Sequence, residues 1–147
     1  MTVIVDYGCG NLSSIANMIK KTGGKAIVTS DPAEIAAAEK IILPGIGAFD
    51  TGMSRLNEMG FVDILNQKAL KEKIPVLGIC LGMQLMTRGS EEGVMKGLSW
   101  FDADTLKFTF NPASELKVPL MGWKYVQQKK ASRLLEGMYE APKFYFV

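Results

Sequence analysis

The sequence contains no histidine, and this absence limits the chemistry that its 147 residues can carry out alone. Histidine is the usual general base near neutral pH and the commonest protein ligand of metals. The chain has only two cysteines, Cys9 and Cys80, which lie far apart and do not form a disulfide framework. We therefore predict no metal site and no cofactor, and we expect a reducing, cytoplasmic setting in which either thiol can react.

Long apolar runs and an excess of charge of one sign are also missing. No stretch approaches the roughly 20 apolar residues that a membrane-spanning helix needs. Seventeen basic and 15 acidic residues give a net charge of +2, without the clustered basic residues typical of nucleic-acid binding. Neither a membrane nor a nucleic acid is predicted as a partner.

The apolar residues that are present follow an alternating order of strands and helices. Hydrophobic content of 48% predicts one globular domain over residues 1–147. Short β-branched runs predict strands at residues 2–7, 25–29, 40–43 and 75–79. Helical spacing predicts helices at residues 12–22, 32–38, 49–59, 61–73 and 81–88. This order predicts an α/β fold with an open, mostly parallel sheet that helices cover on both faces.

The pattern changes after residue 88. Residues 100–110 have the partly alternating, β-prone character of antiparallel strands, and residues 121–126 and 144–147 predict two further short strands. The chain stops inside the apolar run at residues 144–147. We therefore expect the domain to be incomplete at its C-terminus.

Three glycine-rich turns follow predicted strands, at residues 8–11, at residues 44–47 and around Cys80. In parallel sheets, chemistry gathers beyond the carboxyl ends of the strands. These three turns should therefore lie close together in the folded chain.

The third turn has the glycine–x–nucleophile–x–glycine pattern of a strand-to-helix elbow, with Cys80 between Gly78 and Gly82. Such an elbow holds the nucleophile in a strained backbone and places it near a helix N-terminus. The N–H of Leu81 then points where an oxyanion would form. We therefore predict Cys80 to be a catalytic nucleophile and Cys9 to be a buried, structural cysteine.

Residues 76–84 resemble the nucleophile segment of the class I (triad) glutamine amidotransferases. Residues 6–11, residues 43–49 and the Met121-Gly122-Trp123 run are similar, within that family, to the glutaminase subunits of imidazole glycerol phosphate synthase from histidine biosynthesis. The resemblance covers the whole chain and implies a flavodoxin-like amidotransferase fold.

This resemblance implies that the chain hydrolyses glutamine to glutamate and ammonia through a glutamyl thioester on Cys80. Gly45, Ile46 and Gly47 match the family's oxyanion strand, in which a backbone N–H must turn toward the developing charge. Gln84 matches the residue that contacts the substrate glutamine.

The resemblance also implies a partner, a (β/α)₈-barrel synthase subunit that receives the ammonia within a heterodimer. The residues that match the family's docking face are Asn11, Met121, Gly122 and Trp123.

Other functions remain open. Leu120 and Lys124 stand where the family usually has histidine and asparagine, which favours a paralogue that supplies ammonia for surface-polysaccharide sugars. A non-catalytic docking subunit is a third possibility. It would need neither Cys80 nor the turn at residues 44–47, so the presence of both argues against it. A cysteine-elbow hydrolase or chaperone of another type is a fourth possibility. It would not need Gln84, so the presence of that residue argues against it.

The family's catalytic histidine and the glutamate that orients it follow a strand whose end resembles residues 144–147. Neither residue is present here, and no other residue replaces the base convincingly. We therefore expect the 147 residues by themselves to be a truncated, inactive form of an amidotransferase.

Overall fold

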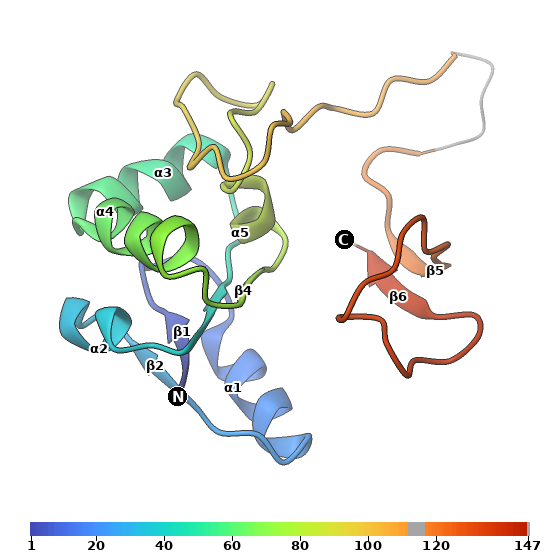
Figure 1. Ribbon diagram of the computed structural model, residues 1–147. Coiled ribbons are helices and arrows are strands. Elements are labelled where there is room, and N and C mark those ends of the chain that lie inside the picture. Colours follow the sequence, from blue (N-terminus) through green and yellow to red (C-terminus); the bar gives the residue numbers. More distant parts are fainter. Residues whose placement is uncertain (112–116, 147) are drawn as a thin grey trace. The chain divides into compact units, whose positions relative to one another are not determined.

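The computed structural model describes residues 1–111 and 117–146, and the chain divides into two compact units, Met1–Lys107 and Phe108–Val147. Strands and helices alternate along the first unit (Figure 1). They are β1 (Thr2–Val5), α1 (Leu12–Lys21), β2 (Ala26–Thr29), α2 (Pro32–Ala36), β3 (Lys40–Leu43), α3 (Phe49–Glu58), α4 (Phe61–Asn66), the π-helix η1 (Gln67–Lys71), β4 (Val76–Gly78) and α5 (Leu81–Gln84). The predicted α/β order is confirmed.

The four strands form one parallel sheet in the order β2-β1-β3-β4. Crossovers between parallel strands are almost always right-handed. Because β2 lies on one side of β1 and β3 and β4 on the other, the β1–β2 crossover runs in the opposite direction to the next two, and its helix covers the opposite face. Accordingly, α1 lies on one face and α2, α3 and α4 lie on the other (Figure 1). The strand order reverses at β1, and in sheets of this kind ligands bind beyond the carboxyl ends of the strands at such a point.

The main core lies between this sheet and the helices that follow β2. Val3 and Val5 belong to it, whereas Ile4 is equally buried and lies outside this cluster, as the two-residue period of a strand requires. Helices α2 to α5, with Leu85 just after α5, contribute apolar side chains to the same cluster: Ile35, Phe49, Met53, Leu56, Phe61, Leu65, Leu81 and Leu85. Burial on this face holds the strand ends, and therefore the turns, in place.

Local capping signals determine where two helices begin. The side chain of Asn11 accepts a hydrogen bond from the N–H of Ser14 at the start of α1. The carboxylate of Asp31 accepts one from the N–H of Ala33, and Pro32 occupies the first turn of α2. Both caps follow the preference of helix N-termini for short polar side chains and for proline just inside the helix.

The helix after Cys80 is shorter than its sequence predicts. It was expected to continue to Arg88 but ends at Gln84. The next two carbonyls, of Leu85 and Met86, accept hydrogen bonds from the N–H groups of Leu98 and Trp100. Because these carbonyls bind distant N–H groups, they do not accept the hydrogen bonds that would continue the helix. The periodicity of the helix sequence does not reveal such distant partners.

The expectation of antiparallel strands at residues 100–110 was wrong. The strand-like pairing of this segment is limited to one isolated parallel bridge, between Ser90 and Thr105. Trp100 instead lies against the helical layer, and its indole N–H donates to Asn66 at 2.7 Å. Tertiary contacts therefore override the β-propensity of this run.

The second unit holds an antiparallel pair, β5 (Gly122–Tyr125) and β6 (Lys143–Phe146). Both lie where short strands were predicted, although residue 147 is outside the described residues. Trp123 meets Tyr145 edge to face, with ring centroids 5.7 Å apart. Across residues 1–111 and 117–146, no helix has both the length and the apolar character to cross a membrane.

Candidate active site

The three glycine-rich turns that follow β1, β3 and β4 meet at one end of the sheet. The hydroxyl of Tyr7, just after β1, donates to the carbonyl of Pro44, just after β3, at 2.5 Å. A Cβ added to Gly45 would lie 2.9 Å from the backbone nitrogen of Gly82, and one added to Gly10 would lie 3.3 Å from Pro44. The predicted convergence is therefore confirmed.

Cys80 has a backbone conformation that L-residues rarely adopt, with φ 53° and ψ −119°. Such a conformation costs of order 1–3 kcal/mol and persists only where surrounding contacts enforce it. The N–H of Ile79 donates to Leu43 at 3.0 Å, and the N–H of Gly82 donates to Ile79 at 3.0 Å. The first bond attaches the residue before Cys80 to β3, and the second closes the turn onto α5. The strained elbow predicted from the sequence is present.

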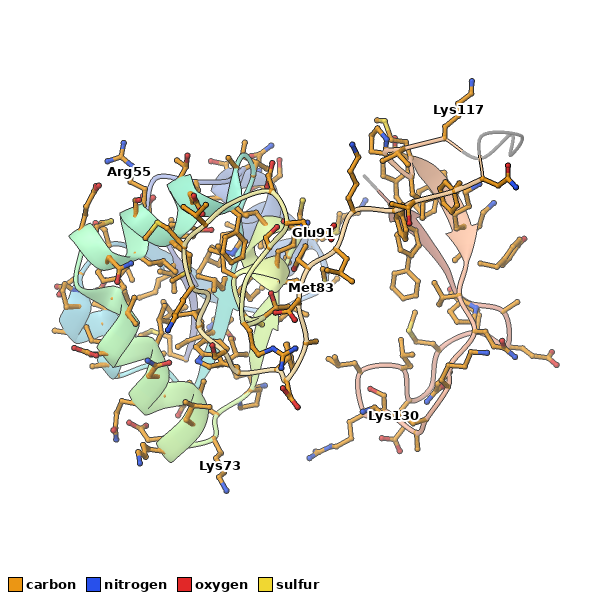
Figure 2. The ribbon with its side chains drawn as sticks, turned by 90° about the horizontal axis from the view of Figure 1, so that it is seen from above. Arg55, Lys73, Met83, Glu91, Lys117 and Lys130 are labelled. Carbon is orange, nitrogen blue, oxygen red and sulfur yellow. The ribbon has the colours of Figure 1, made fainter. Side chains whose placement is uncertain are left out.

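The two glycines of the elbow are sterically required. A Cβ on Gly78 would lie 2.6 Å from the Cα of Met83, in the middle of α5, the helix that Met83 marks in Figure 2. A Cβ on Gly82 would overlap the carbonyl oxygen of Leu43. Only glycine at both positions allows the strand, the turn and the helix to approach this closely.

The two thiols differ in accessibility. Cys80 is exposed, whereas Cys9 is buried and only 8% accessible. Burial raises the pKa of the Cys9 thiol, and the charge of Arg55 lowers it by a smaller amount. Cys9 therefore resembles a packed structural thiol, and Cys80 is the one that an external electrophile can reach.

Iodoacetamide is expected to modify Cys80 at least about ten times faster than Cys9, because the thiolate is the reactive form and the Cys9 thiol is both buried and harder to ionise. Peptide mass mapping over time, repeated between about pH 6 and pH 9, measures both rates. Cys9 should react appreciably only at the alkaline end of this series. Faster modification of Cys9 would show that the nucleophile has been assigned to the wrong cysteine.

The turn at residues 45–47 is fixed at one end and open at the other. Gly45 lies against buried atoms, since an added Cβ would come within 2.5 Å of the Tyr7 hydroxyl. Ile46 is 62% exposed. Gly47 has φ +98° and open space where a Cβ would lie. A peptide beside Ile46 can therefore reorient without disturbing the anchored end.

Of the remaining predicted site residues, Asn11 caps α1 in the first unit, and the others lie on α5 and in the second unit. Leu81 is the first residue of α5, so its N–H has no acceptor within the helix. Gln84 is half-buried one turn beyond Cys80, and its N–H donates to the Cys80 carbonyl at 3.2 Å. In the second unit, Met121 is 57% and Trp123 is 63% exposed.

A loop that lies on the start of α3 was not expected from the sequence. The carboxylate of Glu92 accepts the N–H of Phe49 at 3.1 Å, and Asp50 accepts the N–H groups of Val94 and Met95, each at about 3 Å. Negative charge is favourable at a helix N-terminus, and this one directly follows the turn at residues 45–47. The partners are more than 40 residues apart, so no local motif identifies them.

Tyr7 was also missed, although a signal existed. It ends an apolar strand run and is completely buried, and a buried phenol normally requires a hydrogen-bond partner. Within the parts of the chain that the structure describes, no group of three or more histidine, cysteine, aspartate or glutamate side chains could hold a metal ion.

Comparisons with known proteins identify relatives over the whole length of the chain. The family model described as glutamine amidotransferase class-I matches residues 3–146. The imidazole glycerol phosphate synthase subunit HisH 2 of Methanococcus maripaludis is 51% identical over 147 residues, and HisH 2 of Pseudomonas aeruginosa is 44% identical over the same length. Each match covers 100% of this chain and 72% of the relative.

A solved structure described as a glutamine amidotransferase has the same fold. Its TM-score is 0.64 at 17% sequence identity, over 84% of this chain and 62% of that one. At this identity the likeness concerns the fold alone, whereas the family match and the HisH relatives rest on sequence. The chain belongs to the class I glutamine amidotransferase family.

Proposed function

We propose that this chain provides the glutaminase function of an imidazole glycerol phosphate synthase, with Cys80 as the nucleophile. The observation that carries the proposal is the exposed thiol on a strained elbow, packed against a glycine turn with one open end. Relatives named as subunits of that synthase are 39–51% identical over the full length of this chain.

In the proposed reaction, the sulfur of Cys80 bonds to the side-chain amide carbon of glutamine. The amide oxygen becomes an oxyanion, for which the N–H of Leu81 and one N–H of the turn at residues 45–47 are the candidate donors. Collapse breaks the C–N bond and releases ammonia once a proton reaches the nitrogen. Water then hydrolyses the thioester to glutamate. The proton transfers require an acid–base group, and these 147 residues contain no histidine.

A test of Cys80 should therefore not depend on acid–base catalysis. A chloroketone analogue of glutamine meets this condition, because the sulfur forms a C–S bond while chloride leaves. The analogue is expected to label Cys80, and L-glutamine should slow the labelling while D-glutamine should not. Mass mapping of the labelled peptide gives the site and the rate.

The matched controls are the two cysteine variants. Cys80→Ser should abolish labelling, and Cys9→Ser should leave the rate at Cys80 within about twofold, since the Cys9 thiol is buried and only an accessible thiolate reacts. Labelling of Cys9, or labelling that L-glutamine does not slow, would contradict the proposal.

The ammonia acceptor belongs to the same proposal. The names of the relatives indicate a synthase with a second subunit, which we take to be a (β/α)₈-barrel cyclase in a heterodimer. Both cysteines are free, as suits the reducing cytoplasm in which we place the complex. Lys124 is exposed on β5 and stands where the family usually has asparagine. It therefore favours a second candidate function, in which a paralogue supplies ammonia to surface-sugar synthesis.

A further inference from the structure

Tyr7 has a polar contact that a tyrosine used only for packing would not need. Its side chain has no exposed surface, yet its hydroxyl donates to the carbonyl of Pro44 at 2.5 Å, across 37 residues of sequence. The bond joins the end of β1 to the first residue of the turn that follows β3. It therefore lies at the start of the candidate oxyanion turn rather than within the body of the core.

This bond sets the orientation of one peptide unit. The peptide between Pro44 and Gly45 is trans and, like other peptide units, close to planar. In a trans peptide the C=O and N–H point in opposite directions. Holding the carbonyl of Pro44 against Tyr7 therefore directs the N–H of Gly45 to the opposite side.

Packing reinforces the same anchor. The Cα of Gly45 lies so close to its surroundings that an added Cβ would meet the Tyr7 hydroxyl at 2.5 Å and the Cβ of Leu81 at 2.9 Å. Leu81 directly follows Cys80, so the anchored peptide is fixed against the elbow. Beyond this point the turn is free, because Ile46 is exposed and Gly47 has open space around it.

The phenol also remains a donor when the nucleophile ionises. Burial raises the pKa of Tyr7 well above its ordinary value, and the nearby thiol groups of Cys9 and Cys80 raise it further. A thiolate at Cys80 therefore opposes loss of the Tyr7 proton, and the hydrogen bond to Pro44 persists across the pH range in which cysteine reacts.

We propose that Tyr7 is a positioning residue for the oxyanion turn. Its hydroxyl fixes the Pro44–Gly45 peptide, so that reorientation is confined to the two peptides on either side of Ile46 and an N–H there can turn toward a carbonyl oxygen at Cys80. This role rests on the proposed glutaminase function. It predicts that removing the hydroxyl impairs reactions that need the oxyanion donor and spares those that need only the thiol.

The test compares two electrophiles on the full chain with Tyr7→Phe. The chloroketone analogue of glutamine has a carbonyl oxygen that the oxyanion donor must bind, whereas iodoacetamide needs only the sulfur. Labelling of Cys80 by the chloroketone is expected to slow about tenfold, since a misdirected donor loses part of its stabilisation. The iodoacetamide rate should change by less than about twofold. Tyr139→Phe, at a site that is 87% exposed, should leave both rates unchanged.

Cys9 reports on the fold in the same samples, because it is buried in the same core cluster as Tyr7. Slow modification of Cys9 together with selective loss of the chloroketone reaction supports the positioning role. Equal chloroketone rates in wild type and Tyr7→Phe would overturn this role. A parallel fall in both reactions, or rapid modification of Cys9, would also overturn it, because either result would assign Tyr7 to general stability. Failure of wild type to be labelled at Cys80 would instead overturn the proposed function.

Discussion

Gly82→Ala is expected to destabilise the first unit by about 3 kcal/mol or more, the range for substitutions that force backbone atoms to move. The added Cβ would overlap the carbonyl oxygen of Leu43, which itself accepts the N–H of Ile79 at 3.0 Å. Neither β3 nor α5 can move without breaking the contacts that hold Cys80 in its strained conformation. Urea unfolding followed by far-UV circular dichroism measures the loss.

Gly89→Ala is the matched control for this prediction. At that site the nearest atom to an added Cβ is the Met95 carbonyl oxygen at 3.8 Å, and the backbone is not left-handed. Its stability should stay within about 0.5 kcal/mol of wild type. If Gly82→Ala unfolds at the same urea concentration as the control, the elbow has more room than its packing indicates.

If the proposed barrel subunit docks on β5, Trp123→Ala is expected to weaken its binding by roughly 2 kcal/mol, or about thirtyfold in Kd, as is typical of an aromatic hot spot. The ring is 63% exposed and contacts Tyr145 only edge to face. Most of its apolar surface therefore remains available to a partner. Titration calorimetry with a cyclase subunit of imidazole glycerol phosphate synthase measures the change.

Tyr139→Ala serves as the control for this surface, since Tyr139 lies in the same unit and is 87% exposed. It lies outside the run that resembles the family's docking face and should leave Kd within about twofold. Equal affinities for Trp123→Ala and wild type would remove Trp123 from the docking face. A barrel from surface-sugar synthesis that binds more tightly than the histidine-pathway cyclase would favour the second candidate function.

Local signals predicted most of the first unit. Asn11 and Asp31 each cap a helix through a neighbour two or three residues away, so the information lies within one turn of the chain. The prediction of strands at residues 100–110 failed because the deciding contacts there are not local. The β-branched and aromatic residues of this segment favour strands in isolation, but Trp100 binds Asn66 and the carbonyl of Met86. Such contacts depend on residues that periodicity does not connect.

The candidate site was predictable to the extent that backbone geometry requires a residue type. Gly78 and Gly82 must be glycines because α5 passes so close to β4 and to β3, and this requirement appears directly in the sequence. The partners of the residues that support the turn were not predictable. Tyr7 acts through Pro44, and Asp50 through the N–H groups of Val94 and Met95. A single tyrosine or aspartate does not reveal a partner dozens of residues away.

The strand order β2-β1-β3-β4 has a consequence for how the chain forms during synthesis, which proceeds from the N-terminus. Once β1 and β2 have paired, β3 can add to the free edge of β1 and β4 to the free edge of β3. Each strand leaving the ribosome thus meets an edge that already exists. Tyr7 and Pro44 can join before Cys80 has left the ribosome, so this order lets the turn form before the reactive sulfur is exposed to solvent.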